Sequence, residues 1–243
     1  MWGLLGETVR LLAAHLHLFT LISLTVWLPG HLARNYLEFF GPSERSLLPS
    51  LRLVLAIQLL FDPLVVAATL SALGRIKQGL PVGYATAMGE GLAAWWRLFL
   101  VRFVISSAVV LPALAGLAVV PAGVRGLVAA SLLLAVAVLV LIGLVRYAVV
   151  DSVVVLGGAN VVTAWRRAAR VTAGQRWPIL WTATILFIVI FAGAILVGEV
   201  LRAAPELNHF VVRVMVDCAL AVGQSAFTIA LFLFYWRGRA AAV

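Results

Sequence analysis

The sequence predicts an all-α integral membrane protein with six transmembrane helices. Of the 243 residues, 64% are hydrophobic and 11% are charged, whereas soluble domains carry about 25% charged residues. The apolar residues gather in runs of about 20 or more, which is the length of a helix that crosses a bilayer core. These runs lack the short alternating pattern of a membrane barrel, so each is expected to be a helix.

The six expected spans are joined by short polar segments rich in glycine and proline. The spans cover about 16–33, 51–73, 98–119, 127–150, 179–201 and 210–235. No cleavage pattern of small residues follows the first run, so we expect it to be a retained span and not a signal peptide. No stretch is long and polar enough for a separate soluble domain, and residues 1–243 are therefore expected to form a single transmembrane domain.

Basic residues predict the orientation of the chain. Six spans place both termini on one side, and 12 of the 18 Lys and Arg residues fall there: Arg10, Arg75, Lys77, Arg97, Arg102, Arg146, Arg166, Arg167, Arg170, Arg176, Arg237 and Arg239. This bias places both termini in the cytoplasm and the protein in the plasma or inner membrane. The net charge of +9 suits a protein that faces anionic lipid. Because no separate basic domain is visible, a nucleic-acid partner is not expected.

Three similar segments recur at intervals of 80 residues. They are AAHLHLFTLISL from Ala13, AAWWRLFLVRF from Ala93 and AGQRWPILWTATILF from Ala173. Each follows a helical segment, at about 7–12, 84–92 and 162–172, and each leads into an odd-numbered span. The pattern indicates a threefold internal repeat with units 1–80, 81–160 and 161–243, in which an interfacial amphipathic helix precedes two spans. The alternative is six spans with similar polar entries.

The third interfacial segment is the most basic. Arg166, Arg167 and Arg170 are three or four residues apart and share one helix face. Such a face can lie against anionic headgroups, with about 1 kcal/mol of attraction for each arginine. The alternative is ordinary flanking charge of the positive-inside kind, which needs no headgroup specificity.

The stretch AVVDSVVVLGGANVVTAWRRAARVTAGQRWPILW, from Ala148, resembles the signature of the glycerophosphoryl diester phosphodiesterase membrane-domain family and of related six-span bacterial proteins. Comparable places are filled by Asp151, Gly157, Ala164, Arg167, Gly174 and Trp177. The sequence has Asp151 where glutamate is usual, and alanine where a serine is expected. The resemblance implies a six-span membrane fold and no catalyst, because in the named members the hydrolase is a separate soluble barrel.

Asp62 is the most unusual polar residue, because it lies well inside the second predicted span. A carboxylate at such depth costs about 2.5–3.5 kcal/mol and needs protein, water or a partner beside it. Pro63 follows, and Asp before Pro is typical of a helix start. The span is therefore expected to break or kink, with Asp62 either capping the freed N–H groups or forming a polar site at a broken helix.

Asp217 lies in the sixth predicted span, four residues after Arg213, and this spacing permits a local ion pair. Gln58 and Gln224 are further polar groups in spans two and six. If these two spans pack together, Asp62, Asp217 and both glutamines could line one cavity.

No cofactor or metal site is expected, since no His, Cys and carboxylate cluster has ligand spacing and no phosphate loop or nucleophile elbow is present. We expect a non-enzymatic membrane protein that organises lipid or a partner protein at the cytoplasmic leaflet. The alternative is a small transporter or channel that uses Asp62 and Asp217. A membrane-embedded enzyme comes third, because no nucleophile and base pair is visible.

Overall fold

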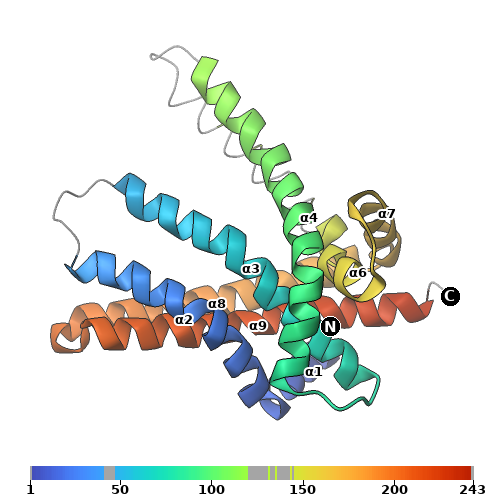
Figure 1. Cartoon of the computed structure of the whole chain (residues 1–243), viewed down its shortest axis with the longest axis horizontal. Coiled ribbons are helices and arrows are strands. Elements are labelled where there is room, and N and C mark those ends of the chain that lie inside the picture. The colour runs from blue at the N-terminus through green and yellow to red at the C-terminus, as the bar shows by residue number, and fades with distance from the viewer. Residues whose placement is uncertain are drawn as a thin grey trace.

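The computed structural model describes residues 2–40, 47–119, 131, 135, 143 and 145–241, with side chains left out for 47–57, for 108–119 and for a few single residues. Its elements are all helical: α1 (Trp2–Ala14), α2 (Leu16–Phe40), α3 (Leu47–Lys77), α4 (Tyr84–Val119), α6 (Val150–Gly157), α7 (Val161–Val171), α8 (Arg176–Ala203), the short 3-10 helix η2 (Pro205–Leu207) and α9 (Phe210–Ala241). Helices α2, α8 and α9 follow the long axis of the molecule, and α6, α7 and the C-terminus lie toward one end of it (Figure 1).

The structure confirms the all-α membrane class. Within the described residues, four helical stretches are long and apolar enough to cross a membrane: Leu16–Phe40, Gln58–Lys77, Arg176–Ala203 and Phe210–Arg239. A fifth span results if the segments Val145–Gly157 and Val162–Val171, bent by 119°, are one broken span. Most of predicted spans 98–119 and 127–150 lies where side chains are not described, so six spans stay a prediction.

Two of the three predicted interfacial segments are separate helices, α1 and α7. The middle segment, about 84–92, is helical but continues without interruption into α4, which runs for 36 residues. At about 1.5 Å per residue, α4 is longer than a bilayer core is thick. The reason is local: no glycine–proline turn separates this segment from the apolar run that follows it, in contrast to the glycine turn after α7.

The expected break at Asp62 and Pro63 is wrong, because α3 continues through both residues to Lys77. Pro63 is buried in the packed part of the helix. Transmembrane helices tolerate proline where neighbouring helices compensate for the lost hydrogen bond. Here α4 and α6 pack against α3 and supply that support.

Small residues allow α3 and α4 to approach closely. Ala67, Ala68 and Ala72 of α3 are fully buried. At Gly91 of α4, an added Cβ would lie 2.7 Å from the Cα and the backbone nitrogen of Ala68. Without a hydrophobic driving force in lipid, such contact between backbones is a main source of helix association. The α3–α4 hairpin is therefore a tight unit, while α2 packs mainly against α9.

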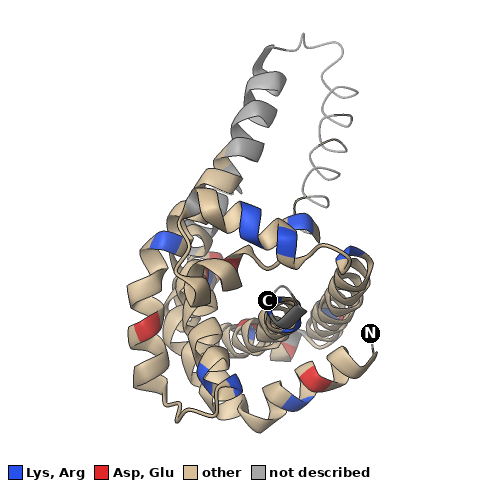
Figure 2. Ribbon diagram, turned by 90° about the vertical axis from the view of Figure 1, so that its right-hand side faces the viewer, with Lys and Arg blue, Asp and Glu red and all other residues tan. Residues whose placement is uncertain are grey.

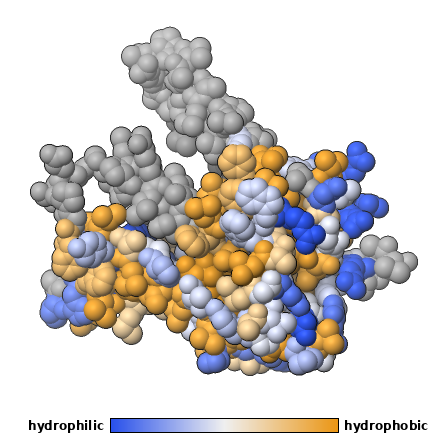
Figure 3. Space-filling model, in the orientation of Figure 1, coloured by the Kyte–Doolittle hydropathy of each residue, from blue (hydrophilic) through white to orange (hydrophobic). Residues whose placement is uncertain are grey.

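Helix α8 exposes a long apolar surface. It is the least buried of the four candidate spans and packs along α9. Its outer side exposes Phe187, Ile188, Phe191 and Leu196 by more than half of their surface. Apolar surface covers much of the body in Figure 3, and hydrophilic groups gather at the end that carries α7. This distribution fits contact with acyl chains along the bundle and with water at its end.

We predict that Gly91→Ala destabilises the protein by about 1–3 kcal/mol, because the added methyl group overpacks the α3–α4 crossing. Unfolding of the full chain in mixed detergent micelles measures the effect. Gly89→Ala is the matched control, since a Cβ there meets nothing within 4 Å. Equal stability of the two variants would contradict the close approach.

Candidate functional site

Arg102 of α4 joins two carboxylates from different helices, and we call these three residues the Arg102 network. The Nη1 group of Arg102 donates to Asp62 of α3. Its Nη2 group donates to Asp151 Oδ2 of α6 at 2.6 Å, and its Nε group donates to Asp151 Oδ1 at 3.4 Å. The guanidinium group therefore holds Asp151 through one edge, with Nε and Nη2, and Asp62 through Nη1, a geometry that only arginine offers.

The Arg102 network explains how the Asp62 carboxylate is accommodated within α3: it pairs with Arg102. Asp62 is 41% exposed in its side chain, Asp151 24% and Arg102 25%, so the surrounding helices leave the three groups incompletely covered. A lone intramembrane charge is costly, and pairing relieves most of that cost. One arginine between two carboxylates leaves one formal negative charge in excess.

Sequence reasoning missed Arg102 by counting it with the charges that flank the membrane. The signal was available: Arg102 falls inside the predicted span 98–119, where an arginine needs an acidic partner. Asp62 and Asp151, both at the edge of or within apolar runs, were the partners at hand. Asp151 itself was noted only for its place in the family resemblance.

Asp217 lies in a second cluster, between α2 and α9. It accepts a 2.8 Å hydrogen bond from Asn35 Nδ2, and His31 Nδ1 lies 3.9 Å from it. The expected ion pair with Arg213 is not formed: Arg213 approaches Glu38 of α2 at 3.8 Å instead. The correction follows from packing, because α9 packs against α2 and Asp217 lies on the side that meets Asn35 and His31 of α2.

The four polar residues proposed for one cavity do not share a site in the structure. Asp62 belongs to the Arg102 network, and Asp217 belongs to the cluster with Asn35 and His31. Gln58 and Gln224 are exposed. A different polar link joins α2 to α9 within the core, where the hydroxyl groups of Ser23 and Ser225 lie 3.3 Å apart.

Helix α7 carries the three predicted headgroup contacts on one exposed side, the basic face of α7. Arg166, Arg167 and Arg170 are all exposed. Among the described residues, none of the three has an acidic partner. Figure 2 views the molecule from this end and shows the basic segments of α7 at its surface. Charges that lack partners within the protein remain available to a ligand.

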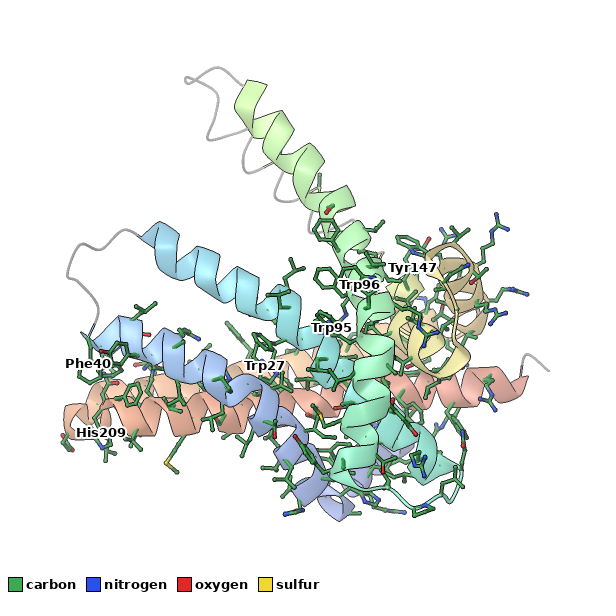
Figure 4. All side chains as sticks on the ribbon, viewed as in Figure 1. Trp27, Phe40, Trp95, Trp96, Tyr147 and His209 are labelled. Atoms are coloured by element: carbon green, nitrogen blue, oxygen red, sulfur yellow. The ribbon has the colours of Figure 1, made fainter. Side chains whose placement is uncertain are left out.

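Helix α7 is fixed in place by its N-terminal cap, by buried residues and by a hydrogen bond at its C-terminal end. Asn160 caps it, with its side chain accepting a 3.1 Å hydrogen bond from the Thr163 backbone N–H. Ala164 and Ala168 are fully buried. At its end, the Thr172 hydroxyl donates to the Arg146 carbonyl at 2.9 Å. On the opposite face, the Trp165 ring packs against Tyr147 with centroids 4.5 Å apart; Figure 4 labels Tyr147 beside α7.

Glu7 of α1 ties three elements together near the N-terminus. It accepts 2.6 Å hydrogen bonds from Lys77, at the end of α3, and from Arg237 of α9. The hydrogen bond from Lys77 is the main cause that lowers the pKa of Glu7 below its ordinary value, and Arg237 adds to it against the opposing effect of burial. A pocket of about 440 Å³ opens beside this cluster, lined by Gly3, Gly6, Glu7, Arg10, Leu11 and Lys77.

In the part of the chain that the structure describes, no group of three or more His, Cys, Asp or Glu residues is arranged to hold a metal ion. Comparison of the chain with models of protein families, with characterised proteins and with solved structures finds no match.

We predict that Arg102→Gln lowers stability by about 1–3 kcal/mol, because it strands two carboxylates; partial exposure keeps the loss below the cost of breaking a fully buried pair. Asp151→Asn should cost more than Asp62→Asn, since Asp151 receives two of the three hydrogen bonds and is less exposed. Thermal unfolding in detergent measures the order. Arg166→Gln, at an exposed position, serves as control, and the reverse order would contradict the geometry.

Glu7 should make stability depend on pH in the acidic range. A lowered pKa in the folded state means that the stabilisation is complete above the pKa of an unfolded glutamate, about 4.3, and is lost as pH falls through the folded pKa. The difference in unfolding midpoint between the wild type and Glu7→Gln should therefore be largest near neutral pH and shrink below about pH 4. A difference that is constant with pH would exclude this role.

Proposed function

We propose that the protein is a non-enzymatic membrane module that organises anionic lipid at the cytoplasmic leaflet through the basic face of α7. The observation that carries the proposal is that Arg166, Arg167 and Arg170 are exposed together on a capped helix and have no acidic partner among the described residues. Lys77 and Arg237, by contrast, share Glu7 as an acidic partner. A surface with this charge attracts the headgroups of an anionic leaflet.

The proposal includes the topology expected from the sequence: six spans, both termini cytoplasmic, and a threefold repeat with an interfacial helix at the start of each unit. Exposed tryptophans support a boundary position for the same end of the molecule. Trp177 and Trp181, which follow α7 in the chain, expose 70% and 55% of their surface. Tryptophan is typical of the level of the headgroups. The resemblance to the diester phosphodiesterase membrane-domain family remains a prediction.

A small transporter is the second candidate, and the Arg102 network is the observation that favours it. A site with two carboxylates and one arginine between three helices has an uncompensated negative charge that a proton or a cation can neutralise. Asp217 does not contribute to this network, so the transporter hypothesis now depends on Asp62 and Asp151.

Replacement of Arg166, Arg167 and Arg170 by glutamine should reduce the co-purification of anionic lipid with the protein. The probe is a vesicle with about 30% phosphatidylglycerol, which gives a strongly anionic surface. Loss of about 1 kcal/mol for each arginine predicts at least tenfold weaker binding to these vesicles. Lipid analysis by mass spectrometry and vesicle flotation of the full chain measure both effects.

The charge-matched control replaces Arg34, Arg202 and Arg213, which lie at the other end of α2, α8 and α9. Equal lipid binding by both triple variants would exclude a specific role of α7. If Asp62→Asn abolishes a proton or cation flux in proteoliposomes while the α7 variant keeps it, the transporter hypothesis replaces the lipid hypothesis.

A further inference from the structure

Three polar groups from three helices surround the turn between α6 and α7. The nearest atom to a Cβ added at Gly158 is Arg97 Nη1 of α4, at 3.7 Å. A Cβ added at Gly157 would lie 3.8 Å from the Tyr235 hydroxyl of α9 and 4.0 Å from Arg167 Nη1 of α7. We call the turn and these three side chains the turn site. Its donors lie far apart in the sequence, on α4, α7 and α9, and only the fold brings them together.

Both residues of the turn are glycine, so neither places a side chain beside the three polar groups. Gly158 has a φ of 59°, a left-handed conformation that ends α6 and that glycine adopts without strain. Gly157 is helical and exposed, and it has no side chain to fill the space in front of Tyr235. A methyl group at Gly157 would make ordinary contacts, so the opening is not dictated by crowding.

Tyr235 is the group that lacks an explanation within the protein. It is 94% buried, from a relative exposure of 6%, yet its hydroxyl has no hydrogen-bond partner among the described residues. The hydroxyl oxygen is not among the fully enclosed polar atoms that lack a partner, so it keeps accessible surface beside the turn. Arg97 and Arg167 have no acidic partner within the same part of the chain. Three donors therefore lie close to one turn, and none of them has an acceptor among the described residues.

The position of the turn adds a further attraction for anions. It leads directly into α7, whose 11 residues direct the positive end of the helix dipole toward the turn. A carboxylate has two oxygens for these donors, whereas a phosphate ester has up to three terminal oxygens spread tetrahedrally. Two guanidinium groups and a phenol supply more donors than a carboxylate can accept in one plane, and they suit a phosphate better.

We infer that the turn site binds one phosphate ester, held by Arg97, Arg167 and the Tyr235 hydroxyl against the Gly157–Gly158 turn. The inference rests on the proposed function only in taking the end of the molecule with α7 to be the lipid–water boundary. It goes beyond that function because it replaces a diffuse charged surface by a single built site. The phosphate belongs either to the headgroup of a membrane lipid or to a water-soluble ester.

The test uses the full chain in nanodiscs. In one arm the discs contain phosphatidylcholine with a small fraction of phosphatidic acid, and binding is read from native mass spectrometry. In the other arm the discs contain phosphatidylcholine alone, and sn-glycerol 3-phosphate is titrated by calorimetry. Retention of phosphatidic acid supports a lipid source, and binding of glycerol phosphate supports a soluble source. Binding in neither arm overturns the inference.

Two variants isolate the turn site. Tyr235→Phe removes one hydrogen bond to a charged ligand and should weaken binding about tenfold. Gly157→Ala places a methyl group in the opening and should weaken binding at least as much, whereas Gly193→Ala, where a Cβ meets nothing within 4 Å, should not. If Gly157→Ala lowers the unfolding temperature, its weaker binding could come from lost stability, and the affinity of Tyr235→Phe is then the deciding measurement. Unchanged affinity of Tyr235→Phe overturns the inference.

The failure of this inference is distinguishable from the failure of the proposed function. Arg202→Gln removes a basic charge at the far end of α8, outside both the basic face of α7 and the turn site. It should leave phosphate binding at the turn site within about twofold. If Tyr235→Phe binds phosphate like the wild type while the triple α7 variant loses anionic lipid, the turn-site inference is wrong and the proposed role of the basic face of α7 is supported. If the triple variant keeps bulk anionic lipid while Tyr235→Phe loses phosphate binding, the proposed role of the basic face is wrong and the turn-site inference is supported.

Discussion

The pairing of Arg102 with Asp62 and Asp151 is the interaction on which the arrangement of α3, α4 and α6 depends. Each of these charges would be costly alone in an apolar environment, and each becomes tolerable only when the other helices are in place. Arrangements of the three helices that leave these charges apart are therefore less stable than the arrangement that pairs them. Dispersion contacts between small residues, such as Gly91 against Ala68, then hold α3 and α4 at close range.

The position of α6 connects this charged pairing to the molecular surface. Asp151 lies in the first turn of α6, and Gly157 is the last of the eight residues of this helix. Because Arg102 holds the start of α6, the turn that follows is placed beside α4 and α9. The neighbouring helix α7 is in turn fixed by its cap and by buried alanines. The paired charges of the Arg102 network thus help to position α6, and through it the basic face of α7 at the end of the bundle.

The basic residues divide into those with an acidic partner in the protein and those without one among the described residues. Glu7, Glu90 and Glu199 each pair with nearby basic residues, so these basic residues have a protein partner. The arginines of α7 and Arg97 have none among the described residues. Since a folded chain gains little from solvated charges without partners, this contrast directs attention to ligands outside the chain. Lipid at the cytoplasmic boundary is the ligand that the proposed topology supplies.

The sequence by itself determined the class of the protein, because long apolar runs with few charges have only one stable environment. It also determined the exposed basic helix, since Arg166, Arg167 and Arg170 are neighbours in the chain and local spacing decides which face they share. The tertiary structure decided every long-range pairing: Arg102 with its two carboxylates, Asn35 with Asp217, and Tyr235 at the α6–α7 turn. Local rules misassigned Asp62 as a helix cap and Arg213 as the partner of Asp217. Pairing of charges between helices depends on which faces pack together, and spacing along one helix carries no information about that choice.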